Sequence, residues 1–202
     1  MICAVVLAAG LSSRMGVQKL LLPFGGKTVI SHIVEQIHAS TIDEVHIIVG
    51  YQAELISNEL FGRAVSIVNN PNYESGMLSS VRCGLNSLPE KCRAVMVILG
   101  DQPSITTELI NKILQSYAAT EKSILVPLYE GKRGHPVLFS LKYRDEIMTQ
   151  YDCVGLRGLL HNHPEEVFEL KVSTASVLCD MDYPEDYRRE LGLNNRDHPE
   201  NP

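Results

Sequence analysis

Apolar residues in the first 127 positions form short continuous runs separated by longer amphipathic stretches. The runs are typical of strands covered on both faces, and they span residues 2–7, 45–49, 64–68, 95–99 and 123–127. The stretches between them repeat apolar residues at helical spacing and predict helices over residues 29–38, 52–60, 78–88 and 105–117. This alternation predicts an α/β fold with a mostly parallel sheet and right-handed crossovers.

The regular alternation of predicted strands and helices ends after residue 127. A Gly-Lys-Arg-Gly-His-Pro turn precedes a short apolar run at 136–139, two predicted helices near 143–148 and 156–161, and a predicted strand at 167–172. We expect this part to elaborate an edge of the sheet. Residues 192–202 hold almost no apolar side chains and predict a disordered tail, which leaves one domain over residues 1–191.

Length and charge narrow the function classes. A chain of 202 residues is sufficient for one domain with a sizeable core. Its formal net charge of −6 leaves no diffuse basic field for nucleic acid or an anionic membrane surface. The apolar run over residues 1–9 is too short to span a membrane and has no basic residues before it, so a buried strand is favoured over a signal peptide. We therefore expect a cytoplasmic protein.

Cysteine usage supports that location. The five cysteines are odd in number, widely scattered and nowhere in C-x-x-C spacing; they are Cys3, Cys83, Cys92, Cys153 and Cys179. This pattern fits reduced thiols, packed as small hydrophobic side chains, better than a disulfide framework or a zinc site.

The strongest chemical signal follows the first predicted strand, in Leu-Ala-Ala-Gly-Leu-Ser-Ser-Arg-Met-Gly at positions 7–16. Small residues let a backbone approach a ligand closely, and turn amides of this kind attract phosphate oxygens. Arg14 offers a planar fork and Lys19 a mobile charge for the same oxygens. The spacing matches neither a G-x-G-x-x-G fingerprint nor a P-loop, because Val17 stands at the P-loop lysine position. A surface turn with a solvated Arg14 is the alternative interpretation.

The loop resembles the L-A-A-G-x-S-x-R-M-G signature of the MobA-like nucleotidyltransferases, followed here by K-L-L-L-P at 19–23. Its Ala-Ala form is most similar to that of the molybdenum cofactor cytidylyltransferases. The resemblance implies a Rossmann-like three-layer sandwich and a triphosphate-binding role for the loop, with Arg14 and Lys19 on the phosphates. The nucleotide-binding residues it implies here are Leu7, Ala8, Ala9, Gly10, Ser12, Ser13, Arg14 and Lys19.

Asp101 ends the fourth predicted strand in a Leu-Gly-Asp-Gln-Pro segment. A carboxylate at this end of a parallel strand points into the crevice where open α/β sheets bind ligands. Mg²⁺ takes one or two carboxylates together with phosphate oxygens. The segment could instead cap the following helix, but the family resemblance includes G-D-Q-P and favours Asp101 as a catalytic metal ligand.

The second candidate ligand lies in Asp-Met-Asp-Tyr-Pro-Glu-Asp at 180–186. The resemblance matches this stretch to a D-x-D-T-P-x-D segment, so that Asp182 is the expected second ligand and Asp180 the reserve. Tyr183 stands where Thr is usual in the family. An acidic helix start explains Glu185 and Asp186 but leaves the first two aspartates unexplained.

Two further segments suggest where the base and the acceptor bind. The Asn- and Ser-rich stretch 69–80 offers donors and acceptors for a ligand's polar edge, although a turn with a helix cap is the alternative. The resemblance places Asn70, Gly76 and Ser80 beside the nucleotide. The resemblance also implies that five residues bind the acceptor; they are Gln102, Pro103, Gly134, His135 and Pro136. Taken alone, His135 is more typical of a structural or surface histidine.

These motifs predict a Mg²⁺-dependent transfer in which a terminal phosphate of the acceptor attacks the α-phosphate of a nucleoside triphosphate. The resemblance implies CTP as donor, molybdopterin-bound molybdenum cofactor as acceptor, and a client molybdoenzyme as a possible partner. A cofactor guanylyltransferase shares nearly every motif, and Ala9 is the local feature that favours cytosine. The same motifs leave open a sugar-phosphate or alditol-phosphate nucleotidyltransferase and a non-catalytic nucleotide sensor.

Overall fold

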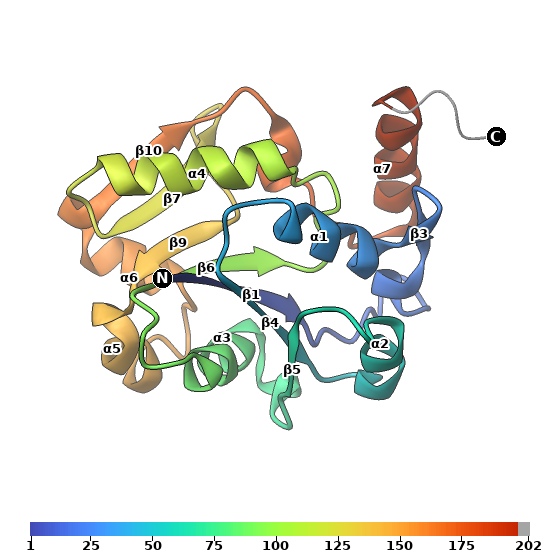
Figure 1. Cartoon of the computed structure of the whole chain (residues 1–202), viewed down its shortest axis with the longest axis horizontal. Helices are drawn as coiled ribbons and strands as arrows, with labels where there is room; N and C mark the ends of the chain where they lie inside the picture. Colours follow the sequence, from blue (N-terminus) through green and yellow to red (C-terminus); the bar gives the residue numbers. More distant parts are fainter. Residues whose placement is uncertain (198–202) are drawn as a thin grey trace.

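One mixed sheet forms the centre of the molecule. The structure is a computed structural model that describes residues 1–197. Its strands follow the order β10–β7–β9–β6–β1–β4–β5, with β8 paired to β7 (Figure 1). Their bounds are β1 Ile2–Ala8, β4 Glu44–Val49, β5 Ser66–Asn69, β6 Ala94–Leu99, β7 Ile124–Tyr129, β8 Lys132–Arg133, β9 Val137–Ser140 and β10 Val167–Lys171. A separate hairpin pairs β2, Pro23–Phe24, with β3, Lys27–Thr28.

Most strand pairs are parallel, as the hydrophobic pattern predicted. β1 pairs with β4 and β6, β4 pairs with β5, and β7 pairs with β10, all in parallel. The exceptions in this sheet are β8, which is antiparallel to β7, and β9, which lies between β6 and β7 and is antiparallel to both. The expectation that everything after residue 127 elaborates an edge is therefore wrong for β9. Its continuous apolar pattern reflects burial on both faces inside the sheet.

Helices cover both faces of this sheet, which confirms the three-layer α/β architecture. Helices α1 and α4 lie over one face, and α3, α5 and α6 pack on the other (Figure 1). The helix bounds are α1 Val29–His38, α2 Ala53–Glu59, α3 Met77–Ser87, α4 Thr107–Ala119, α5 Arg144–Thr149, α6 Arg157–Asn162 and α7 Pro184–Asp197. Helices α1 and α4 begin at capping threonines: Thr28 accepts from the Ser31 amide and Thr106 from the Leu109 amide.

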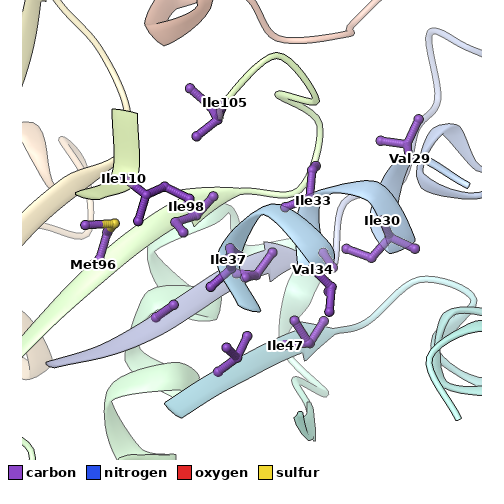
Figure 2. Close-up of a cluster of buried hydrophobic side chains, with 14 of the residues drawn as sticks. Val29, Ile30, Ile33, Val34, Ile37, Ile47, Met96, Ile98, Ile105 and Ile110 are labelled. Atoms are coloured by element: carbon purple, nitrogen blue, oxygen red, sulfur yellow. The ribbon is translucent and has the colours of Figure 1, made fainter. Parts of the chain in front are cut away.

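The core under α1 shows why the apolar spacing of residues 29–38 produces this packing. Ile33, Val34 and Ile37 share one stripe of the helix and are almost fully buried. Figure 2 shows this stripe facing Ile47 on β4 and Ile98 on β6. Burying each such side chain contributes on the order of 1.5–3 kcal/mol, so this contact fixes α1 on the sheet.

The last described helix runs beyond the predicted end of the domain. Helix α7 continues to Asp197, past residue 191, so residues 192–197 of the predicted tail are helical in this structure. Residues 198–202 of that predicted tail lie outside the described residues. Within the described part of the chain, each helix is too short or too polar to cross a membrane.

Candidate functional site

A cleft of about 460 Å³ opens where β1 and β6 reach their carboxyl ends. Open α/β sheets bind ligands at this edge because parallel strands deliver their loops there together. The cleft is lined by Leu7, Ala8, Ala9, Gly10, Leu11, Ser12, Ser13, Arg14, Lys19, Leu20, Tyr73, Glu74, Gly76, Met77, Ser80, Leu99, Asp101, Asp180 and Asp182. Every residue that the sequence analysis chose from the first loop is among them.

The loop after β1 is held by a buried glutamine that the sequence analysis missed. The Ser12 hydroxyl donates to Gln18 Oε1 at 3.1 Å, and Gln18 Nε2 donates to the Tyr51 carbonyl oxygen at 3.3 Å. Ser12 also accepts from the Lys19 amide at 3.4 Å. Gln18 is buried, and Ser12 has a φ of 52°, in the left-handed region. These contacts give the loop a fixed shape and direct the Lys19 side chain into the cleft.

Lys19 and Arg14 bring positive charge to one wall, and two aspartates face them. The Lys19 ammonium donates to Asp101 Oδ2 and, at 3.2 Å, to Asp182 Oδ1. Arg14 donates to Asp182 Oδ2 at 2.6 Å. Two carboxylates separated by 81 positions therefore converge on one ammonium group. The sequence analysis required them to meet, and the structure brings them together.

Burial distinguishes the two cations. The Lys19 side chain is 12% exposed, whereas that of Arg14 is 60% exposed. Burial favours a lower Lys19 pKa, but the Asp101 and Asp182 carboxylates outweigh it and hold the Lys19 pKa above its usual value. Burial raises the pKa of Asp101 against the opposing effect of Lys19, and nearby Asp180 adds to the rise. Lys19 is therefore a fixed cation, whereas Arg14 can move toward a ligand.

Backbone contacts place the two aspartates. Gly100 turns the chain after β6 so closely that an added Cβ would lie 2.8 Å from the Leu7 carbonyl oxygen. The Met181 amide donates to the Asp101 carbonyl oxygen at 3.0 Å, which joins the segment before α7 to the end of β6. Asp186 accepts from the Asp182 amide at 3.2 Å. This contact lies at the start of α7. The acidic segment 180–186 can therefore cap that helix and also form one wall of the cleft.

The aspartate pair is suited to a divalent cation. Asp101 and Asp182 already share a positive charge, the Lys19 ammonium, between their oxygens. Hard cations such as Mg²⁺ prefer this kind of oxygen donor, with phosphate and water completing the shell. Asp180 also lines the cleft, so a third carboxylate lies within the same site.

The Asn-rich segment contributes in two ways. Gly76 and Ser80 line the cleft, as do Tyr73, Glu74 and Met77, which the sequence analysis did not select. Asn70 does not line it. Its side-chain amide is buried and donates to the hydroxyls of Ser79 and Ser80 at 2.9 and 3.0 Å. Asn70 therefore positions the start of α3 and, in this structure, does not reach the ligand space.

The five residues expected at the acceptor do not line this cleft; they are Gln102, Pro103, Gly134, His135 and Pro136. Gln102 is buried, and its Oε1 has no hydrogen-bond partner among the described residues. An added Cβ on Gly134 would lie 2.1 Å from the Val177 carbonyl oxygen, which also accepts from the His135 amide at 2.9 Å. These contacts support the segment that leads to Asp182.

His135 is electrostatically neutral in this setting. Its burial lowers the imidazole pKa to about 4, while Asp180 opposes the shift and Arg157 adds to it. A neutral imidazole can accept or donate one hydrogen bond without adding charge. Its acceptor-binding role stays a prediction.

Comparison with known proteins agrees with this geometry. The sequence model of the MobA-like NTP transferase domain matches residues 4–167. The molybdenum cofactor cytidylyltransferase of Escherichia coli K12 is 25% identical over 187 residues, which cover 91% of this chain and 92% of the relative.

Solved structures extend the comparison. Rv0371c from Mycobacterium tuberculosis H37Rv is 30% identical with a TM-score of 0.84, over 95% of this chain and 97% of that one. The same protein solved as a complex with manganese is 28% identical with a TM-score of 0.80, over 95% and 98% of the two chains. Since the domain match covers most of the chain and the fold and motifs agree with it, this protein belongs to the MobA-like NTP transferase family.

Proposed function

We propose that this nucleotidyltransferase transfers CMP from CTP to the terminal phosphate of a molybdopterin-type cofactor and releases pyrophosphate. The observation that carries the proposal is the convergence of Lys19, Asp101 and Asp182 in the cleft beside the loop after β1. A site with only one sign of charge could hold a nucleotide, but fixed charges of both signs suit a transfer in which charge shifts toward the leaving group.

The loop and its cations have a defined role in this reaction. An oxygen of the acceptor phosphate attacks the α-phosphorus, and the bond from that phosphorus to the β-bridging oxygen breaks. Backbone amides of the loop after β1 and the Lys19 ammonium hold the departing pyrophosphate, and Arg14 leaves Asp182 to contact it. The second pKa of a phosphate monoester is about 6, so the attacking group is largely ionised at neutral pH and needs no general base.

The carboxylates would hold the divalent cation. Asp101 and Asp182 would ligate Mg²⁺, with Asp180 in reserve, and when bound the ion would neutralise charge developing on the phosphate oxygens. The manganese complex of Rv0371c supports a divalent cation in this fold.

The proposed preference for a cytosine nucleotide rests on the similarity to a molybdenum cofactor cytidylyltransferase and on the wall of the cleft that contains Ala9. Ala9 is almost fully buried yet lines the cleft, and an added Cβ on Gly50 would lie 2.9 Å from the Ala9 methyl and 2.6 Å from Tyr73 Cβ. Ala9, Gly50 and Tyr73 therefore pack closely, which leaves little freedom for this wall to move aside for a larger purine base.

The test is release of pyrophosphate from CTP, GTP, ATP and UTP, each with Mg²⁺ and molybdopterin-bound molybdenum cofactor. We expect release with CTP that depends on the acceptor. Release with GTP alone would indicate a guanylyltransferase, and release only with a sugar or alditol phosphate would indicate a transferase for that class of acceptor. Tight binding of a nucleotide without turnover with any acceptor would indicate a sensor and contradict the proposal.

A further inference from the structure

A second cluster of ligand-type side chains lies at the amino end of the sheet, away from the cleft. Cys3 lies near the start of β1, and Glu44 and His46 lie near the start of the neighbouring strand β4. The parallel register pairs Cys3 with Glu44 and Val5 with His46. Alternation along a strand then directs all three side chains to one face, the face covered by α3.

The cluster is compact and largely closed to solvent. One ligand atom from each of Cys3, Glu44 and His46 lies within 4.8 Å of the other two. Cys3 is completely buried and His46 is 3% exposed, whereas the Glu44 side chain is 39% exposed. The Cys92 thiol adjoins that of Cys3 and donates to the Ala94 carbonyl oxygen at 3.2 Å.

The hydrogen bonds of Ser87 fix the histidine tautomer. The Ser87 hydroxyl donates its single proton to the Gly84 carbonyl oxygen at 2.7 Å. With that proton used, the 3.0 Å contact fits the tautomer in which His46 Nδ1–H donates to the hydroxyl oxygen. In the neutral ring, Nε2 therefore carries the lone pair. Burial lowers the His46 pKa, which favours this neutral form although Glu44 opposes the shift.

That lone pair has no hydrogen-bond partner among the described residues. His46 Nε2 is buried, and its nearest charged neighbour is Glu44 Oε2 at 3.7 Å, too far for a hydrogen bond. Lys91 pairs with the other carboxylate oxygen, Oε1, at 3.1 Å. Two electron-rich atoms thus face each other across a gap in a largely buried site. A cation between them would satisfy both.

We propose that Cys3, Glu44 and His46 bind a thiophilic divalent metal ion of the Zn²⁺ class. Zn²⁺ accepts this mixed set of sulfur, nitrogen and carboxylate oxygen ligands in tetrahedral geometry. Its usual bond lengths place a nitrogen and an oxygen ligand about 3.4 Å apart, close to the observed gap of 3.7 Å. The Ser87 contact supplies the outer hydrogen bond that ligating histidines commonly make.

This site is separate from the nucleotide cleft. Cys3 and Ala8 are five residues apart on β1, which is roughly 16 Å of extended strand. The ligands come from β1 and β4, so the metal would tie two neighbouring strands together. Sequence spacing disfavoured a zinc site, because the three residues share no short motif. We expect the metal to act on stability, with the transfer chemistry left to the cleft.

The test uses Co²⁺ as a spectroscopic probe on the full chain, reduced and stripped of metal, with excess Mg²⁺ to occupy oxygen-ligand sites. We expect one equivalent of Co²⁺ to produce a thiolate-to-metal charge-transfer absorption that Zn²⁺ abolishes by displacement. Cys3→Ser should remove that absorption. Cys153→Ser is the matched control, because Cys153 is exposed and outside the cluster, and it should behave as the unmodified protein does.

Glu44→Gln keeps the test decisive if Cys3→Ser does not fold, because its side chain lies at the half-exposed rim. We expect this variant to weaken Co²⁺ binding about tenfold or more. Absence of the charge-transfer absorption in the unmodified protein would overturn the proposal. So would an unchanged absorption in Cys3→Ser, or an unchanged Co²⁺ affinity in Glu44→Gln.

Discussion

The two halves of the chain build the cleft in different ways. The part before residue 100 supplies the cations from one continuous loop, in which Arg14 and Lys19 are five residues apart and Gln18 holds the backbone. The part after residue 127 helps to place Asp182 through contacts between distant segments. These include β9 inside the sheet, Gly134 against Val177, and the Met181 amide on the Asp101 carbonyl oxygen.

Because of this difference, we expect the first loop to determine nucleotide affinity and the later segments to determine where the acidic side chains lie. A local loop can lose one side chain and keep its shape, because neighbouring residues determine that shape. A long-range assembly transmits a disturbance to every group it supports. Substitutions on the cation side should therefore change nucleotide affinity, and substitutions that support the acidic side should change stability and placement together.

Asp101 contacts both of these parts, because Lys19 donates to its carboxylate and the Met181 amide to its carbonyl oxygen, so its loss should have the largest effect. Asp101→Asn removes a proposed metal ligand and a partner of Lys19, and we expect transfer to fall by at least about a hundredfold while the fold survives. Steady-state pyrophosphate release with CTP and the acceptor measures this. Asp145→Asn, an exposed carboxylate on α5, is the matched control. Near-normal turnover of Asp101→Asn would remove Asp101 from the metal site.

Gly134→Ala probes the long-range half. The added Cβ would meet the Val177 carbonyl oxygen, a backbone atom with little freedom to move, and we expect a loss of about 1–3 kcal/mol in the free energy of unfolding. Denaturant unfolding measures this loss. Gly10→Ala in the first loop is the contrast, because its Cβ would meet no atom within 4 Å and should leave stability nearly unchanged. Equal stability of the two variants would erase the proposed difference between the halves.

Titration of His135, which lies in the part after residue 127, should make the stability of the protein depend on pH. Its folded pKa of about 4 lies below the unfolded value near 6.5, so the unfolded chain binds the proton more tightly. The stability from neutral His135 is full above pH 6.5 and is lost as the pH falls toward 4. We expect the unmodified protein to lose about 1–2 kcal/mol more than His135→Gln over this range, measured by denaturant unfolding. Parallel pH profiles for the two proteins would contradict this.

Arg14→Lys tests the cation side and should have the smallest effect. Lysine keeps the charge but loses the planar fork, so we expect the KM for CTP to rise by about three- to tenfold with kcat and stability little changed. Initial rates over a range of CTP concentrations separate the two constants. A fall in kcat at constant KM would indicate that Arg14 acts in placement, like the residues of the other half.

Sequence predicted the first half in more detail than the second because its signals are local. The strands near 2–7 and 95–99 and the loop motif all depend on neighbours in sequence, and each lies where it was expected. The interior position of β9 could not be predicted, because its four residues carry no mark of which strands they join. The convergence of Asp101 and Asp182 followed only from the resemblance. Gln18 and the Cys3 cluster had no motif to indicate them.

The central claim is that Asp101 and Asp182 hold one divalent cation against the triphosphate in the cleft. A crystal structure with Mg²⁺ and a non-hydrolysable CTP analogue tests it most directly. We predict one Mg²⁺ about 2.1 Å from an oxygen of each carboxylate, bridged to the phosphates, with Arg14 moved from Asp182 to the triphosphate. An ion bound away from both carboxylates, or a nucleotide bound outside the loop after β1, would contradict the claim.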